Sequence, residues 1–222
     1  MSYGLEFGWL QDALLAIARG ASMTMMLIAV TTVFGSAISV LLAAGRRSGN
    51  RLLRQAITAY VELIRNTPFL VQLFFIFFGL PSLGIRLDSV WAAILAMTLN
   101  MAAFTTEIVG AGLDAVPKGQ REAALALGLR PRQVFVKIVL PQALQIIFPA
   151  LTSQIVIMML ESAVVSQISV AELTYQGDML QARTFRAFET YFIITLAYLG
   201  LSIGLRRLLV GAGRATLPAG IS

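Results

Sequence analysis

Long apolar blocks separated by short polar segments run along almost the whole chain. Each block approaches the length of about 20 residues that a helix needs to cross the hydrocarbon core of a bilayer. Runs such as LVQLFFIFFGL (70–80) and WAAILAMTL (91–99) lack the apolar and polar alternation of a barrel strand. The pattern therefore predicts an all-α membrane protein with five transmembrane helices, over residues 21–44, 56–80, 90–111, 142–160 and 191–210.

Composition agrees with a membrane protein. Hydrophobic residues make up 58% of the 222 residues and charged residues only 13%, and the mean hydropathy is +0.81. A soluble fold could not hide that much apolar surface. The first nine residues hold no basic region, so we expect no cleaved signal peptide. The absence of Cys and His excludes disulfides, thiol chemistry and imidazole metal sites, and we expect no catalytic residue and no metal.

Basic residues are concentrated in three segments, and cytoplasmic loops are the ones that retain Lys and Arg. These residues are Arg46, Arg47, Arg51 and Arg54 after the first span, Lys118, Arg121, Arg130, Arg132 and Lys137 after the third, and Arg206, Arg207 and Arg214 near the end. The bias predicts an external N-terminal segment (1–20) and a cytoplasmic tail (211–222). Topology and anionic lipid headgroups account for the net charge of +6, so we expect membrane lipid and no nucleic acid as a partner.

The loop over residues 113–141 contains two short predicted helices. Pro117 is placed to start the first, and Gly128 is suited to stop it in a left-handed conformation. Pro131 opens the second, and Pro141 is expected to break the pattern before the fourth span begins. A short Ala-rich helix between such breaks has small side chains that let another protein approach closely. The loop is interpreted as a docking element.

The same loop resembles the membrane subunits of type I ABC importers. Their signature is Glu-Ala-Ala, three residues, Gly, nine residues and Ile-x-Leu-Pro, and every interval is kept here. The matching residues are Glu122, Ala123, Ala124, Gly128, Ile138, Leu140 and Pro141. The resemblance implies that this loop is a coupling helix that rests in a cleft of a cytoplasmic ATPase. The alternative is a surface helix without a partner.

A narrower resemblance is to the polar amino acid branch of that family. The segments RNTPFLVQLFFIFFGLP (65–81) and TEIVGAGLDAVPKGQREAALALGL (106–129) carry it. The resemblance implies uptake of a polar amino acid, with an opine, cystine or another small polar solute as the alternative. After the fourth span the branch has a Lys followed by Asp or Asn, and this chain departs from it, with Glu161 read as replacing the basic residue.

Polar residues inside the predicted spans are the candidates for a substrate pathway, because charges in a membrane are retained mainly where they face protein or water. Glu62 and Arg65 are placed to pair on one helical face, beside a polar break that ends at Pro68. The candidates are Glu62, Arg65, Asn66, Thr67, Gln72, Asn100, Glu107, Gln154 and Glu161.

Each candidate has a purely structural alternative. Glu62 and Arg65 could do no more than neutralise each other. Asn100 could form a hydrogen bond between helices, and Glu107 could be a solvated residue at a helix end. The phenylalanines at 74, 75, 77 and 78 are interpreted as lipid-facing and packing surface. These alternatives stay open at the level of the sequence.

Five helices without an inverted repeat do not readily enclose an alternating-access path, so a second permease subunit is expected, either identical or related. The chain has no Walker A loop, which places ATP and Mg in a partner ATPase and leaves this chain without a cofactor or enzymatic activity of its own. The resemblance further implies an external solute-binding protein and a bacterial cytoplasmic membrane. A small oligomeric channel and a membrane scaffold are the other classes considered.

Overall fold

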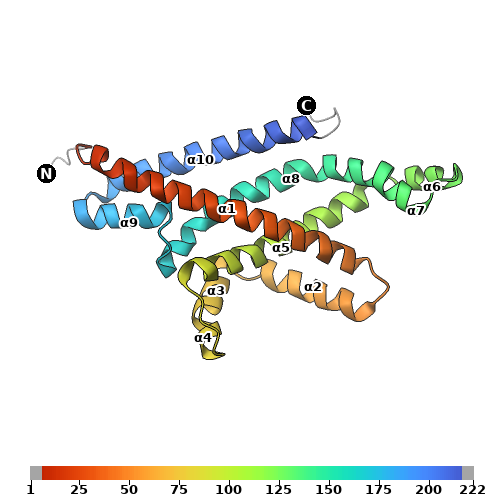
Figure 1. Ribbon diagram of the computed structural model, residues 1–222, viewed down its shortest axis with the longest axis horizontal. Helices are drawn as coiled ribbons and strands as arrows, with labels where there is room; N and C mark the ends of the chain where they lie inside the picture. The colour runs from red at the N-terminus through yellow and green to blue at the C-terminus, as the bar shows by residue number, and fades with distance from the viewer. Residues whose placement is uncertain (1–6, 217–222) are drawn as a thin grey trace.

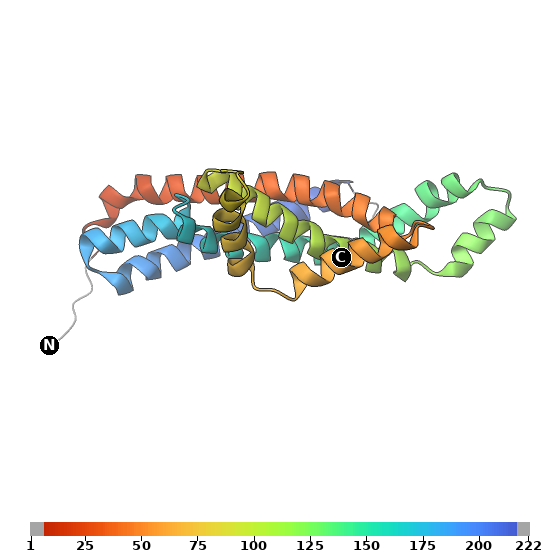
Figure 2. The ribbon, with the colours of Figure 1, turned by 90° about the horizontal axis from the view of Figure 1, so that it is seen from below.

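The computed structural model describes residues 7–216, and all the regular structure in that range is helical. Four long helices form the body of the molecule: α1 (Leu10–Arg46), α5 (Ser89–Ala115), α8 (Leu140–Glu161) and α10 (Ala187–Thr216). They run broadly along one axis in both views (Figure 1, Figure 2). The all-α prediction is confirmed.

Membrane-length helices account for most of the described chain. Four are long and apolar enough to cross a bilayer, and a fifth span exists if a pair of helices bent by 110° is one broken span. The four are Leu10–Arg46, Ser89–Ala115, Pro131–Ile168 and Ala187–Ala215, and the bent pair is Arg51–Arg65 with Phe69–Ser82.

Several helices extend beyond the predicted spans. The first helix begins at Leu10, so it takes in half of the segment 1–20 that was expected to precede the membrane. The helix that carries the fourth span begins at Pro131, inside the predicted loop. The last one continues to Thr216, into the predicted tail. Residues 1–6 and 217–222 lie outside the described residues.

The second predicted span, 56–80, is not one helix. It is divided into α2 (Arg51–Arg65), α3 (Phe69–Phe74), the π-helical turn η1 (Phe75–Gly79) and α4 (Leu80–Ser82). Pro68 has an extended backbone, with φ −63° and ψ 138°. A proline has no N–H to donate and disfavours a helical residue before it, so α2 ends just ahead of Pro68, at Arg65. The arm from α3 to α4 turns away from the long helices (Figure 1).

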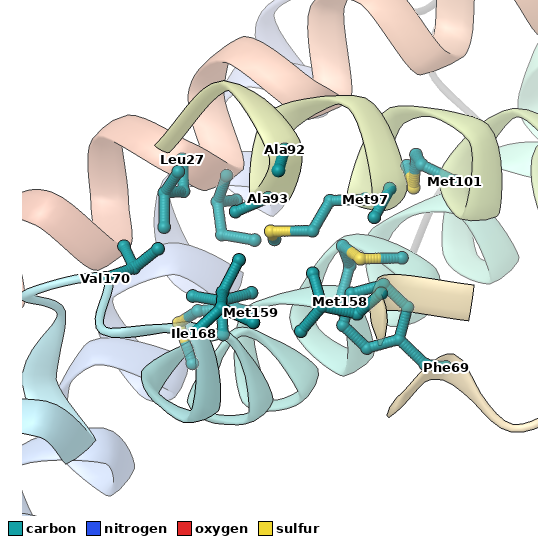
Figure 3. Packing of buried hydrophobic residues seen from close by; sticks show 14 of the residues in the cluster. Leu27, Phe69, Ala92, Ala93, Met97, Met101, Met158, Met159, Ile168 and Val170 are labelled. Atoms are coloured by element: carbon teal, nitrogen blue, oxygen red, sulfur yellow. The ribbon is translucent and has the colours of Figure 1, made fainter. Parts of the chain in front are cut away.

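The core lies where α1, α5 and α8 meet (Figure 3). Methionines Met97 and Met159 are fully buried there against small residues such as Ala93. Small residues let helix backbones approach closely in membranes. Gly112 shows this most clearly, because a Cβ added to it would lie 1.9 Å from Cγ2 of Ile147 on α8.

The two ends of the molecule carry the shorter helices. At one end, α6 (Lys118–Ala126) and α7 (Pro131–Val134) extend beyond the long helices (Figure 2). The π-helical turn η2 (Phe135–Val139) joins α7 to α8. At the other end, the 3-10 segment η3 (Ser162–Ile168) leads from α8 to α9 (Leu173–Thr184), which packs on α1 and α10.

Candidate coupling segment and polar pathway

The helix of the docking loop begins and ends as its sequence predicts. Pro117 is the last residue before α6, and Gly128 follows its end with φ +82°. The Gly128 N–H donates to the Leu125 carbonyl at 3.0 Å, and the Leu129 N–H donates to the Ala124 carbonyl at 3.2 Å. Glycine adopts this left-handed conformation without steric cost. The turn itself therefore favours glycine at position 128.

The signature residues of α6 lie on two different faces. Glu122, Ala123 and Gly128 are exposed, whereas Ala124 is buried against the rest of the loop. Leu127 is 81% exposed and gives the tip an apolar side chain that nothing in the described chain covers. The surface open to a partner is thus formed by Glu122, Ala123, Leu127 and Gly128, while Ala124 fixes the helix to its own support.

Pro141 does not end a helix, and that expectation was wrong. The chain stays helical from Pro131 through η2 into α8, with Leu140 and Pro141 in the first turn of α8. A proline ring clashes with the carbonyl four residues earlier. The wide turn Phe135–Val139 directly before it relaxes that crowding. Ile138, Leu140 and Pro141 are therefore half-buried positions in one continuous helix.

A pair of glutamines connects the docking helix to this continuous helix. The Gln142 amide donates to the side-chain oxygen of Gln120 on α6 at 2.5 Å and to the Ile138 carbonyl at 2.8 Å. This contact could not be predicted from the sequence, because 22 residues separate Gln120 from Gln142 and neither belongs to the signature.

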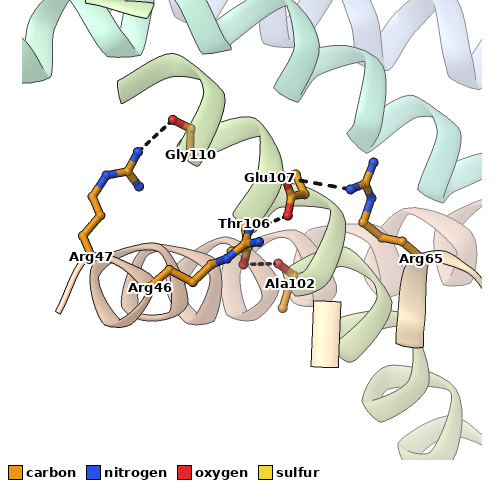
Figure 4. Close-up of polar contacts among 7 residues, drawn as sticks. All are labelled: Arg46, Arg47, Arg65, Ala102, Thr106, Glu107 and Gly110. Carbon is orange, nitrogen blue, oxygen red and sulfur yellow. Dashed lines mark hydrogen bonds and ion pairs between the residues drawn. The ribbon is translucent and has the colours of Figure 1, made fainter. Parts of the chain in front are cut away.

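A charged junction joins α1, α2 and α5 (Figure 4). Glu107 on α5 forms an ion pair with Arg46 of α1, and its other oxygen lies 3.9 Å from Nη1 of Arg65 on α2. The Arg65 guanidinium also lies 5.6 Å from the centre of the Phe104 ring. Glu107 is therefore not a solvated residue at a helix end. Its charge holds three helices together.

The predicted pairing of Glu62 with Arg65 is not formed. Glu62 is exposed and makes no side-chain hydrogen bond or ion pair within residues 7–216, because Arg65 reaches Glu107 instead. Spacing along one helix allowed the pair, but it could not account for a competing carboxylate on α5.

Gln72 is the centre of a second polar cluster, at the bend after α2. Its amide nitrogen donates to the Ile64 carbonyl at 2.7 Å and to the carbonyl and hydroxyl of Thr67 at 3.0 and 2.9 Å. Its side-chain oxygen accepts from the buried Asn100 at 3.0 Å. Asn66 donates to the Glu62 carbonyl at 2.8 Å. The bond from Gln72 satisfies the Ile64 carbonyl, whose helical partner would be the N–H that Pro68 lacks, as a membrane-embedded break requires.

The two candidates on α8 stand apart from both clusters. Gln154 is buried, and Glu161 is half-buried at the last turn of α8. The Glu161 atom Oε2 is inaccessible to solvent and has no hydrogen-bond partner among the described residues. No ion pair or hydrogen bond connects either residue to Asn100 or Glu107 in the part of the chain that the structure describes.

A buried acidic residue, Glu172, was absent from the predicted set. It caps α9 by accepting from the Tyr175 N–H at 2.9 Å, and it accepts from the Tyr198 hydroxyl at 2.6 Å and from Thr24 at 3.4 Å. Burial raises the pKa of the Glu172 carboxyl, and these hydrogen bonds oppose the rise. An acidic residue directly before a helix is a capping signal that the sequence does offer.

Comparison with known proteins identifies the class. The model of the family described as "Binding-protein-dependent transport system inner membrane component" matches residues 35–211. The chain is thus a multi-pass membrane permease component, and it belongs to this family.

The relatives and solved structures that resemble it agree. The chain is 40% identical to the "Probable glutamine ABC transporter permease protein GlnM" of Bacillus subtilis over 67% of this chain and 68% of that protein. It is 33% identical to the "Arginine transport system permease protein ArtQ" of the same organism over 82% and 84% of the two chains. The structure "Crystal structure of an amino acid ABC transporter with histidines" matches with a TM-score of 0.89 and 33% identity, covering 96% of this chain and 100% of that one.

Proposed function

We propose that this chain is the transmembrane permease subunit of an ATP-binding cassette importer that carries a polar amino acid into the cell. The observation that carries the proposal is the geometry of the docking helix. Residues Glu122, Ala123 and Gly128 are exposed on a helix that extends beyond the long helices, as an element that enters a cleft of another protein must be. The names of its relatives, which include glutamine and arginine permeases, support an amino acid as the transported solute.

Such an importer needs three kinds of partner protein. ABC ATPase subunits that hold ATP and Mg would engage α6 from the cytoplasm. A second permease subunit would complete the path, and an external solute-binding protein would deliver the substrate. In this arrangement the N-terminus lies outside and the C-terminus inside the cytoplasmic membrane of a bacterium, which is consistent with the basic residues at the α6 end of the molecule.

The proposed path is lined by the cluster around Glu107, the cluster around Gln72, and Glu161. A carboxylate oxygen that is buried without a partner is suited to an ammonium group, since a buried charge without a counter-charge is costly. Closure of the ATPase pair on ATP would move α6, and the continuous helix from Pro131 would carry the movement to Glu161. Cystine and opines remain within the same class of solute.

The experiment reconstitutes the permease in lipid vesicles with its ATPase, binding protein and a panel of amino acids. ATP hydrolysis stimulated by one of the amino acids is expected to collapse in Gly128→Asp. Gly84→Asp is the matched control, because Gly84 also has a left-handed backbone, with φ +84°, and also has open space around it. Equal hydrolysis by both variants would contradict the coupling role. Failure of wild type to respond to any amino acid would contradict the substrate class alone.

A further inference from the structure

An apolar pocket lies near the docking end of the long helices, where α1 and α5 face η2 and the start of α8. Its volume is about 380 Å³. Ten of its lining residues are apolar and one is Arg47. The apolar residues include Val40, Ala44, Leu113, Phe135 and Leu144.

A second hollow adjoins this pocket on the side of the docking loop. It has a volume of about 480 Å³ and shares Arg47, Leu113 and Phe135 with the first. Arg121 of α6 and Asp114 also line it. The two hollows therefore form one cleft, with an apolar interior and a charged mouth. We call it the Arg47 cleft.

The mouth of the Arg47 cleft carries an excess of positive charge. Arg47 forms an ion pair with Asp114 at 2.7 Å and donates to the Gly110 carbonyl at 3.0 Å. Arg121 makes no ion pair or hydrogen bond with any described residue. One carboxylate therefore faces two guanidinium groups, and a bound anion would balance the remaining positive charge.

The cleft is open to its surroundings along its apolar side. Val40 is 57% exposed, Phe135 is 45% exposed and Leu144 is 38% exposed, and all three lie on helices of membrane length. Apolar side chains at such a place are covered by lipid chains in a membrane. The basic mouth lies at the end of the spans, at the level where lipid headgroups begin.

We propose that the Arg47 cleft is a binding site for an anionic phospholipid of the adjacent leaflet. An acyl chain would occupy the apolar pocket, and the phosphate would accept hydrogen bonds from Arg47 and Arg121. Arginine is well suited to this contact, because its planar guanidinium binds phosphate oxygens in pairs. The bound lipid contacts α1 and α5 on one side and α6 and η2 on the other.

This inference does not depend on which solute is transported. It implies that the charge of the leaflet influences how the docking helix is held, since Arg121 belongs to α6. Vesicles rich in phosphatidylglycerol would hold α6 against Arg47 and α5, whereas zwitterionic vesicles would leave Arg121 unpaired.

The test uses the assembled transporter in vesicles of equal phosphatidylglycerol and phosphatidylcholine. A photocrosslinking p-benzoyl-phenylalanine replaces Phe135, and mass spectrometry of the permease identifies the lipid it captures. The expected ratio of phosphatidylglycerol to phosphatidylcholine is about fivefold, the factor expected for one arginine beside an anionic headgroup. The same probe at Phe192, which is exposed on α10 and outside the cleft, should capture both lipids about equally.

Two variants examine the two parts of the site. Arg121→Gln should reduce the ratio at position 135 to about one, and Arg130→Gln, which changes an exposed arginine that does not line the cleft, should leave it unchanged.

Ala44→Phe should fill the apolar pocket and lower lipid capture several-fold, with Ala37→Phe on the same helix as its control. Ala44→Phe leaves α6 intact, so it decides the question even where Arg121→Gln fails to assemble. Equal ratios at positions 135 and 192, or capture of a protein subunit at position 135, would overturn the proposal.

Discussion

Asn100 on α5 donates a hydrogen bond of 3.0 Å to the side-chain oxygen of Gln72 on α3. Gln72 donates in turn to the Ile64 and Thr67 carbonyls, at 2.7 and 3.0 Å. One amide side chain therefore links α5, α3 and the end of α2, at the place where the chain bends by 110°. Gln72 thus supports the bend beside Pro68.

Replacing Gln72 with methionine keeps most of its volume and removes its hydrogen bonds. We expect Gln72→Met to lower the free energy of unfolding by about 1–3 kcal/mol, because two carbonyls and the Asn100 amide lose a partner. Denaturant titration of the purified permease in detergent measures this. Val71→Met, at a side chain that is 56% exposed, should change the value by less than about 0.5 kcal/mol. Equal effects would show that the bend does not need the amide.

Neutralising Glu107 should be more damaging than neutralising Asp114. Glu107→Gln leaves Arg46 and Arg65 without their carboxylate, whereas Asp114→Asn frees only Arg47. The Glu107 side chain is 35% exposed and that of Asp114 is 76% exposed, so solvent screens the second pair more. We expect a loss of about 1 kcal/mol for Glu107→Gln and almost none for Asp114→Asn. Thermal unfolding in detergent tests this ranking, and the reverse order would contradict it.

Two glycines on α5, two residues apart, should respond oppositely to alanine. A Cβ at Gly112 would lie 1.9 Å from Ile147, whereas nothing lies within 4 Å of one at Gly110. Gly112→Ala should cost about 1–3 kcal/mol through overpacking. Gly110→Ala should gain about 0.5–1 kcal/mol, since alanine is the better helix former. Melting temperatures of the two variants in one detergent decide the point, and a shift of the same sign in both would exclude close packing at Gly112.

The buried Glu172 should make stability depend on pH. Because its folded pKa is raised above the ordinary 4.5, the folded protein retains a proton that the unfolded chain releases. The stabilisation is fully present below pH 4.5 and is lost as the pH rises through the folded pKa. Glu172→Gln mimics the protonated acid. Its stability relative to wild type should therefore rise with pH above about 4.5. Unfolding measured across this range checks the trend, and a difference that stays flat with pH would show that Glu172 is not responsible.

The sequence predicted the apolar spans and the limits of α6 because both depend on local chemistry. Apolar length marks a span, and the backbone preferences of Pro117 and Gly128 set the ends of the docking helix. It failed where a partner comes from another helix. Arg65 binds Glu107 rather than Glu62 because α5 places a carboxylate beside it, and no spacing within α2 contains that information.

Prolines show the same difference between what local chemistry predicts and what neighbouring helices decide. Pro68 was correctly placed at a polar break, but the direction of the chain after it depends on Gln72 and Asn100, which lie on α3 and α5. Pro141 was expected to stop a helix, yet the π-helical turn before it makes room for its ring. Residue type predicts that the regular helix is disturbed at a proline. Neighbouring turns and helices decide whether the disturbance becomes a bend.

One helical path from Pro131 to Glu161 joins the docking end to the membrane interior, through the π-helical turn η2 and past Pro149 inside α8. It extends over about 45 Å at the helical rise of 1.5 Å per residue. As far as η2 and Pro149 resist bending, a tilt imposed on its outer end displaces the Glu161 end in the opposite direction, about the point that the surrounding helices hold fixed. The tight contacts of Gly112 with Ile147 and of Gly213 with Phe148 are the natural pivot, because a Cβ at either glycine would overlap the facing side chain as it lies. The helix from Pro131 to Glu161 would therefore rotate about these two glycine contacts.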